Sequence, residues 1–131
     1  MKIMTKAVIA CLMAFTMLAS CKKDEDKKPN NTSRTLRYEV SGNFTGTIYT
    51  SYTNSSGGTN ANEVITLPWI KEITFSNNIT AAVIGFVGTG GTAGQKVTLV
   101  IKRGGTQVGA PLEIVAEATG SFSKAPGAIV F

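Results

Sequence analysis

A chain of 131 residues allows one folded domain, and its formal net charge of +5 is spread along the sequence rather than gathered in a basic patch. The sequence contains no histidine, and no aspartate follows Asp26. These absences exclude Ser-His-Asp and Cys-His catalysis as well as histidine-ligated zinc or iron sites, and the dispersed charge excludes a nucleic-acid footprint. The composition therefore predicts a protein that is not an enzyme and that holds no cofactor or metal.

The first twenty residues have the pattern of a bacterial lipoprotein signal peptide. After two lysines comes an apolar run, Ala7–Ser20, which at a helical rise covers roughly 21 Å and is too short to span a bilayer. The four residues Leu18-Ala19-Ser20-Cys21 resemble the lipobox, in which small side chains precede the cysteine that takes a diacylglycerol. We therefore predict that residues 1–20 are removed and that Cys21 becomes the lipidated first residue.

Residues 21–33 are charged or polar and include no large apolar side chain, so this segment cannot bury enough surface to fold by itself. We expect a disordered tether that spans about 20 Å as a flexible coil. Within it, Lys23-Asp24-Glu25-Asp26 resembles the acidic export signal that sends some lipoproteins outward through the outer membrane. The sequence thus predicts an outer-membrane lipoprotein facing the cell surface, with a periplasmic location as the alternative.

From residue 34 the apolar residues recur with a period of two, which indicates β-strands with one solvated face. In chain order the first half predicts a strand at Leu36–Val40, a turn at Gly42-Asn43, a strand at Phe44–Thr53, a loop at Asn54–Asn60, a strand at Val64–Leu67 and a corner at Pro68. The second half predicts a strand with Ile73 and Phe75, a turn at Asn77-Asn78, a central strand at Ile79–Val87 that is apolar on both faces, a loop at Gly88–Gly94, a strand at Val97–Ile101, a hairpin turn at 103–106, a strand at Gln107–Ala116 and a short closing strand at Ala128–Phe131.

No amphipathic helical pattern follows Cys21. Seven or eight short strands in about 98 residues predict an all-β domain over residues 34–131, built as an immunoglobulin-like antiparallel β-sandwich. A small β-barrel is the alternative.

Three stretches of this domain resemble the soluble domain of the mycobacterial membrane protein small family. They are Leu36–Gly42 with its Tyr-x-Val-x-Gly pattern, the Thr- and Tyr-rich Thr47–Thr50, and Val64–Trp69 with its Leu-Pro-Trp corner. The likeness continues loosely to Gly105 and covers about seventy residues. The resemblance implies a β-sandwich, an accessory role of the kind its members have beside a lipid or siderophore exporter, and no catalytic residues. This chain departs from the family in its lipid anchor.

The aromatic residues are the strongest candidates for a binding site. Trp69 beside Tyr49 and Tyr52 would offer a stacking surface for a sugar or an anchor for a partner, whereas a tryptophan after a corner proline commonly plugs the end of a sandwich core. The loops at Asn54–Asn62 and Gly88–Gln95 are further places to expect contacts. Among the glutamates, Glu39 and Glu72 occupy outward strand positions, so we interpret them as solvated rather than as a glycosidase pair.

These observations predict a non-catalytic, membrane-anchored module that docks on another protein of the cell envelope. The alternative is a surface lipoprotein that binds carbohydrate or another small ligand through Trp69, Tyr49 and Tyr52.

Overall fold

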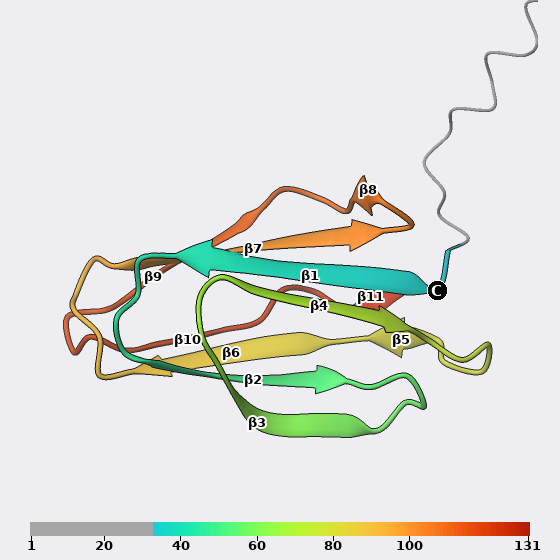
Figure 1. Ribbon diagram of the computed structural model, residues 1–131, viewed down its shortest axis with the longest axis horizontal. Coiled ribbons are helices and arrows are strands. Elements are labelled where there is room, and N and C mark those ends of the chain that lie inside the picture. Colours follow the sequence, from blue (N-terminus) through green and yellow to red (C-terminus); the bar gives the residue numbers. More distant parts are fainter. Residues whose placement is uncertain (1–32) are drawn as a thin grey trace, which may run out of the picture.

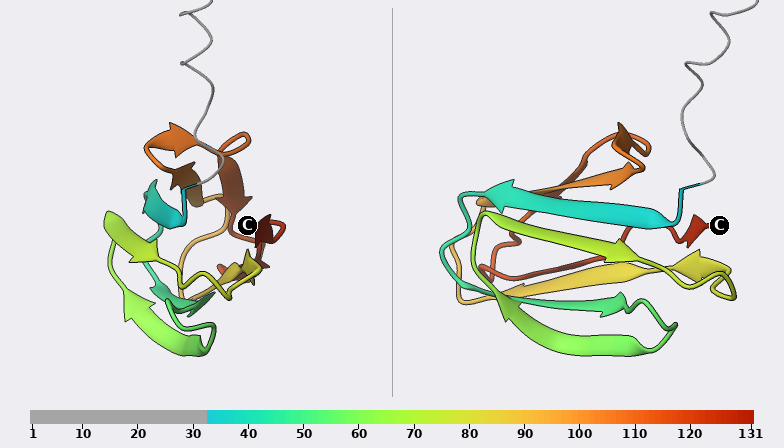
Figure 2. Two further views of the ribbon diagram at one scale, coloured as in Figure 1. Left: turned by 90° about the vertical axis from the view of Figure 1, so that its right-hand side faces the viewer. Right: turned by 45° about the vertical axis from the view of Figure 1, so that its right-hand side comes forward.

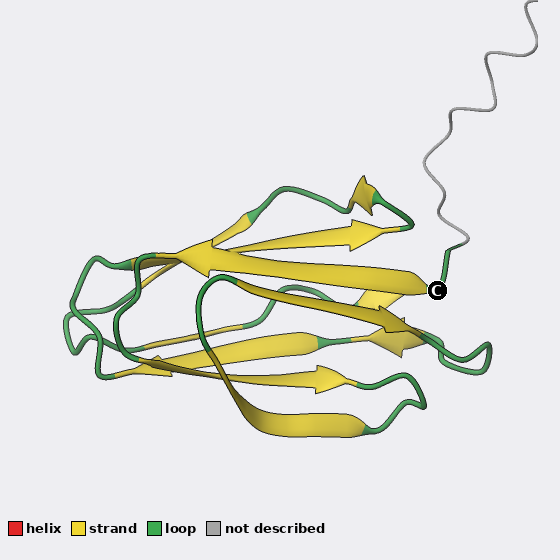
Figure 3. Ribbon diagram, viewed as in Figure 1, coloured by secondary structure: helices red, strands yellow, loops and turns green. Residues whose placement is uncertain are grey.

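The computed structural model describes residues 33–131, which form two antiparallel β-sheets packed face to face (Figure 1). Within these residues the chain has eleven strands and no helix (Figure 3). Eight of the strands are three residues or longer, and no sheet closes on itself, so the predicted β-sandwich is confirmed over the barrel. The predicted signal peptide, the lipidation site at Cys21 and the tether up to residue 32 lie outside the described residues.

The first sheet, called sheet A, is built around the long central strand β1. Its order is β4 (Trp69–Thr74), β1 (Thr35–Gly42), β7 (Lys96–Arg103) and β8 (Thr106–Gln107), with β9 (Leu112–Val115) also pairing with β7. The second sheet, called sheet B, has the order β10 (Phe122–Lys124), β6 (Ile84–Thr89), β2 (Thr47–Thr53) and β3 (Thr59–Ile65). A small ladder joins β5 (Ala81–Ala82) to β11 (Ile129–Val130) beside them. Figure 2 shows the two layers from the end.

One hydrophobic core lies between the sheets, because each strand turns its alternate residues inward. Strand β1 contributes Leu36, Tyr38 and Val40, and sheet B opposes them with side chains such as Ile48 and Phe86; none of these is more than 2% exposed. The alternation seen in the sequence at Leu36–Val40 and Val97–Ile101 is therefore the inner face of sheet A, as predicted.

The predicted strand at Phe44–Thr53 begins later, at Thr47, and the predicted strand at Val64–Leu67 is wrong in both bounds. Phe44 instead closes one end of the core, where its ring meets that of Phe122 edge-on at 4.9 Å. Strand β3 begins at Thr59, inside the predicted loop. It is an exposed edge strand, so its first residues carry no apolar alternation and it is held by pairing with β2.

Two other predicted strands are divided. The prediction of one strand at Ile79–Val87 is wrong, because the pairing changes at Val83 from β11 to sheet B; β6 does occupy the predicted central position, between β2 and β10, and continues to Thr89. The strand predicted at Gln107–Ala116 breaks into β8 and β9 around Pro111. Strand β10 was not predicted, since it is three residues long and buries one side chain, Phe122.

The first and last described residues lie at the same end of the sandwich (Figure 1). Arg103 joins them, since its Nε donates to the carbonyl of Ser33 at 2.7 Å and its Nη1 donates to the carbonyl of Val130 at 3.1 Å. The Phe131 ring lies between the guanidinium groups of Arg34 and Arg103, at 4.6 and 5.0 Å from the ring centroid. This clasp ties the two ends of the described chain together.

Candidate functional site

The three aromatic residues predicted to form one site are separated by the pleat of β2. Tyr49 and Tyr52 are three positions apart, so they point to opposite faces of sheet B. Tyr52 points inward and is 1% exposed, whereas Tyr49 is half-buried on the outer face. Trp69 packs against the core, with its ring centroid 6.1 Å from that of Tyr52. The expectation of a single aromatic surface is therefore wrong, and the core interpretation of Trp69 is supported.

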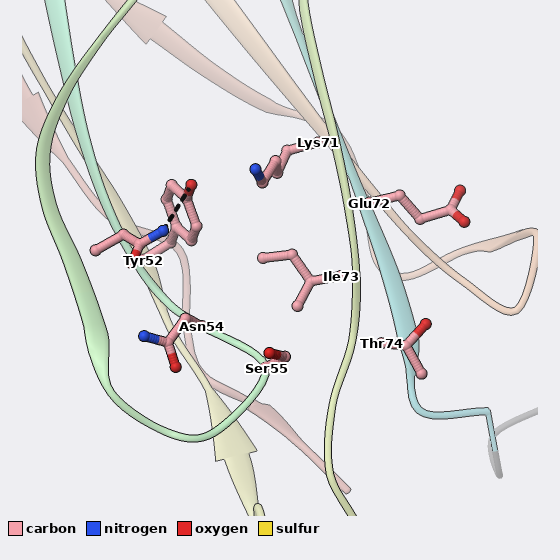
Figure 4. A pocket seen from close by; sticks show the side chains of 8 residues that line it. Tyr52, Asn54, Ser55, Lys71, Glu72, Ile73 and Thr74 are labelled. Atoms are coloured by element: carbon pink, nitrogen blue, oxygen red, sulfur yellow. Dashed lines mark hydrogen bonds between the residues drawn. The ribbon is translucent and has the colours of Figure 1, made fainter.

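A cleft of about 270 Å³ lies between β4 and the β2–β3 hairpin, where the edges of the two sheets face each other (Figure 4). Lys71 extends from β4 toward the Tyr52 ring, with its Nζ 5.8 Å from the ring centroid. The Tyr52 hydroxyl donates to Glu63 Oε2 at 2.5 Å and accepts from Asn60 Nδ2 at 3.1 Å. The Tyr52 hydroxyl is thus satisfied by protein groups, and the buried Tyr52 ring offers little surface to a ligand.

A second hollow, of about 250 Å³, lies at the opposite open edge of the sandwich and is aliphatic. Its walls come from Ile101, Val108 and Leu112 on one side and from Pro126 and Ile129 on the other. It exposes part of the core and includes no hydrogen-bonding side chain, so it has no means of orienting a ligand.

The third hollow, of about 280 Å³, lies on the outer face of sheet B and runs across the strands. Along one side of it lies a row of side chains that the strand register aligns, called here the ridge: Val64, Tyr49, Val87 and Ser123. All of these except Val64 line the hollow. Beside the ridge runs a row of smaller groups, called here the furrow: Asn62, Ser51, Gly85 and Ala125. Each row takes one residue from β3, one from β2, one from β6, and one from β10 or the chain that leaves it. The furrow therefore crosses the whole sheet.

Gly85 makes the furrow deep at its middle. Its backbone is not in the left-handed region, and a methyl group added there would lie 3.7 Å from the Ala125 Cβ, which is ordinary van der Waals contact. The fold therefore has no steric need for glycine at this position. A glycine inside a strand weakens it and often marks a place where a ligand approaches the backbone closely.

The chemistry of the furrow is neutral and polar. Ser51 and Ser123 offer hydroxyl groups, Asn62 offers an amide, and Tyr49 presents part of an aromatic face. Lys124 borders the hollow, but it pairs with the inward-facing Phe86, so its side chain points to the other face of the sheet. Such a set can hold a ligand by hydrogen bonds and stacking.

The outer face of sheet A is different, because it carries ion pairs beside the exposed Ile70 and Val115. Glu39 Oε1 lies 2.8 Å from Arg37 Nε and 3.1 Å from Lys102 Nζ, and Glu72 lies 3.7 Å from Arg37. The hydrogen bond from Arg37, followed by that from Lys102, lowers the pKa of the Glu39 carboxyl from its ordinary value. The outward positions predicted for Glu39 and Glu72 are thus confirmed, and their carboxylates are held by basic neighbours.

The two loops in which contacts were expected lie at opposite ends of the sandwich (Figure 1). The turn of the β2–β3 hairpin lies at the end where the described chain begins, and the loop from Gly90 to Gln95 lies at the far end. They cannot form one site. At the far end Gln95 Oε1 accepts from the backbone amides of Thr45 and Thr92, at 3.1 and 2.9 Å, which fixes the neighbouring loops.

The sequence analysis did not identify Ser51, Asn62 or Gly85 as site residues. Two signals were present in the sequence. The period of two separates Tyr49 and Ser51 from Tyr52, and the apolar run Ile84–Val87 is interrupted by a single glycine, Gly85. The part played by Asn62 depends on strand pairing, which the sequence pattern does not reveal.

No family model matches the chain, and it has no match among curated proteins or solved structures. The resemblance to the mycobacterial membrane protein small family therefore stays a prediction. Residues 33–131 include no helix long and apolar enough to cross a membrane, and they include no group of three or more cysteine, aspartate or glutamate side chains placed to hold a metal ion.

Proposed function

We propose that the chain is a non-catalytic lipoprotein, anchored through Cys21, that binds its ligand on the outer face of sheet B. The observation that carries this proposal is the furrow, an uncharged polar hollow floored by Gly85 and walled by Tyr49. Binding sites of this kind combine an aromatic or apolar surface with a few placed polar groups. The combination favours carbohydrate as the ligand, because a sugar ring has hydroxyl groups at its rim and an apolar C–H face that stacks on an aromatic ring.

The glutamates support the non-catalytic part of the proposal. Glu39 and Glu72 are paired with Arg37, Glu113 lies 3.1 Å from Lys96, and Glu63 accepts a hydrogen bond from the Tyr52 hydroxyl. Three of these carboxylates are thus engaged by basic side chains on sheet A, and the fourth is engaged by Tyr52. None lines the furrow.

The position of the furrow suits an anchored protein. The described chain begins at one end of the sandwich, whereas the furrow lies on its side, so an anchor at that end leaves the furrow open (Figure 1). The thirteen residues from Cys21 to Ser33 would add about 20 Å between the lipid and the domain.

Docking on another envelope protein is the second candidate, and the ridge favours it. Val64 and Val87 are 60% and 44% exposed on either side of Tyr49, with no charged residue in the row. The centres of protein interfaces are likewise depleted in charge and enriched in tyrosine. In this case the ridge would be the contact surface and the furrow would receive a side chain of the partner.

Gly85→Val tests whether the furrow is the site. A Cβ at this position meets no atom closer than 3.7 Å and valine suits a strand, so we expect the variant to fold while polysaccharide binding falls at least tenfold. Binding would be measured by affinity electrophoresis of the full chain in detergent across a panel of polysaccharides. Thr98→Val, on the outer face of sheet A, is the matched control and should bind as the wild type does.

Wild-type binding by Gly85→Val would refute the furrow as the site. If the wild type binds no polysaccharide, the second candidate is tested with a photo-crosslinking residue at Val64 or, as a control, at Val100 on sheet A. Docking predicts one stoichiometric envelope protein captured in intact cells from Val64 and none from Val100.

A further inference from the structure

The end of the sandwich at which the described chain begins, called here the entry end, is positively charged. It is built from residues 33–36, 53–59, 74–81, 101–108 and 126–131 (Figure 1). These segments contain no aspartate or glutamate, and their charged side chains are Arg34, Lys102 and Arg103. Lys102 is paired with Glu39 at 3.1 Å, so the two arginines give the entry end its charge.

The opposite end has the other sign. It is built from residues 43–46, 66–68, 90–95 and 116–121, which contain one charged side chain, that of Glu117. Glu117 forms no ion pair with any residue in the range 33–131. The described domain is therefore polarised along its strands, with positive charge at the entry end and negative charge at the opposite end.

Backbone carbonyls hold the two arginines in place, and no carboxylate neutralises them. Arg103 donates to two carbonyls in the clasp, and Arg34 donates from Nε and Nη2 to three, those of Phe75, Ser76 and Ile79. Neither guanidinium forms an ion pair with any carboxylate among residues 33–131, that of Phe131 included. A guanidinium has five N–H donors in a planar fork that suits phosphate, so both keep donors for an anion.

Apolar side chains lie beside these arginines. Val130 is 68% exposed, and the Phe131 ring lies between the two guanidinium groups. Val108 and Ile129 belong to the same end and line the aliphatic hollow. Exposed apolar groups beside arginines are typical of surfaces that meet a bilayer, because the apolar side chains enter among the headgroups while the charges attract anionic lipid.

We propose that the entry end lies against the headgroups of an anionic phospholipid bilayer, with Arg34 and Arg103 at phosphate groups and Val130 among the headgroups. This inference rests on the proposed anchoring through Cys21 and adds to it the orientation of the domain. A flexible coil of the thirteen residues from Cys21 to Ser33 keeps this end within about 20 Å of the lipid. At the resulting effective concentration a weak contact is sufficient. The strands then stand upright on the bilayer, and the furrow, which crosses them, runs parallel to it.

The experiment measures how each end contacts lipid in the full chain, reconstituted in phosphatidylcholine vesicles with or without phosphatidylglycerol. An environment-sensitive fluorophore is attached to one introduced thiol, Val130→Cys at the entry end or Ala118→Cys at the opposite end. We expect phosphatidylglycerol to shift the emission of the Val130 probe to the blue and to bring it within reach of quenchers at headgroup depth. Neither change is expected at Ala118, and added salt should reverse both at Val130.

Arg103→Gln tests the charge. One arginine at an anionic surface should change the ratio of contacting to free domains about fivefold, so we expect a loss of that size. Arg103→Lys keeps the charge without the planar fork that joins Ser33 to Val130, and it should change the ratio less than twofold. The pair thus separates loss of charge from loss of the clasp. Lys96→Gln, an exposed lysine outside the entry end, is the matched control and should also change the ratio less than twofold.

Several outcomes would overturn the inference. A Val130 probe that stays in water in both kinds of vesicle, while the chain remains bound to them, would refute it and leave the proposed anchoring intact. Equal responses at Val130 and Ala118, or with and without phosphatidylglycerol, would refute it too, as would equal losses in Arg103→Gln and Lys96→Gln. If the unsubstituted chain itself reacts with the fluorophore, it is not processed and lipidated at Cys21, and the proposed anchoring and this inference fail together.

Discussion

The outer faces of the two sheets differ in the charge of the side chains that they present to water. The outer face of sheet A carries six charged residues from its strands: Arg37, Glu39, Glu72, Lys96, Lys102 and Glu113. The strand positions on the outer face of sheet B carry no charged residue, and this face presents hydroxyls, an amide, valines and a tyrosine. A charged, internally paired face stays hydrated, whereas a neutral face with exposed apolar groups gains by being covered. Both faces present polar side chains. The number of charged side chains is therefore what distinguishes the solvated face of this sandwich from the face proposed to bind.

The two sheets should contribute similarly to stability through their inner faces, because both pack into one core. Phe86→Ala in sheet B and Leu99→Ala in sheet A each leave a cavity at a position no more than 2% exposed. We expect each to lower the free energy of unfolding by about 3–4 kcal/mol, with one cooperative transition. Urea denaturation followed by Trp69 fluorescence and by far-UV circular dichroism measures both. Two separate transitions in either variant would show that the sheets are independently stable and would contradict a shared core.

The inner faces do differ in how they bury tyrosine. Tyr38 on β1 is fully buried, its hydroxyl has no hydrogen-bond partner among residues 33–131, and burial raises its pKa to about 12. Tyr38→Phe removes this unsatisfied group, so we expect a gain of about 1 kcal/mol in unfolding free energy. Tyr52→Phe on β2 is the matched control. It should lose about 1 kcal/mol, because the Tyr52 hydroxyl makes two hydrogen bonds.

The wild type and Tyr38→Phe should also differ in how their stability changes at alkaline pH. Unfolded Tyr38 ionises near its ordinary value of 10.0 while the folded residue stays neutral, so the unfolded state binds fewer protons and wild-type stability falls from pH 10.0 toward about 12. Tyr38→Phe should lose less stability over this window, measured by urea midpoints at increasing pH. An equal decline in both proteins would mean that Tyr38 ionises without unfolding.

The smallest effect is expected on the charged face itself. The folded pKa of Glu39 is lowered, so its contribution to stability is present above its ordinary pKa and is lost as pH falls through the lowered value. Glu39→Gln should therefore lower the urea midpoint slightly near neutral pH and leave it unchanged in strong acid, and salt should reduce the difference. Glu117→Gln, in an exposed turn, is the control. A larger loss than that of Tyr52→Phe would mean that the ion pairs of sheet A hold the fold together.

The sequence predicted correctly those features of the fold that depend on the residue pattern of a single strand. The alternation at Leu36–Val40 and Val97–Ile101 identified the inner face of sheet A, and Pro68 marked the corner between the sheets. Strands that depend on partners were misplaced or missed. Edge strand β3 has exposed polar residues that also suit a loop, and β10 is defined by its pairing with β6.

The candidate site was predictable in part for the same reason. Tyr49 was identified as an aromatic candidate, and the period of two could have separated it from Tyr52. The furrow brings together Asn62, Ser51, Gly85 and Ala125, which are distant in sequence. Their alignment follows from the register of three strand pairs, including the irregularity of pairing between β2 and β3 near Asn62, and side-chain chemistry alone does not fix that register.

The clasp at Arg103 has a mechanical consequence. A pulling force applied at Ser33 acts directly on β1. This strand is hydrogen-bonded along its length to β4 on one side and to β7 on the other. Because the pull runs along the strand axis, it loads these two ladders in shear, and many bonds resist together instead of rupturing one by one. The load therefore stays in sheet A, and the outer face of sheet B, which we propose as the binding surface, keeps its shape.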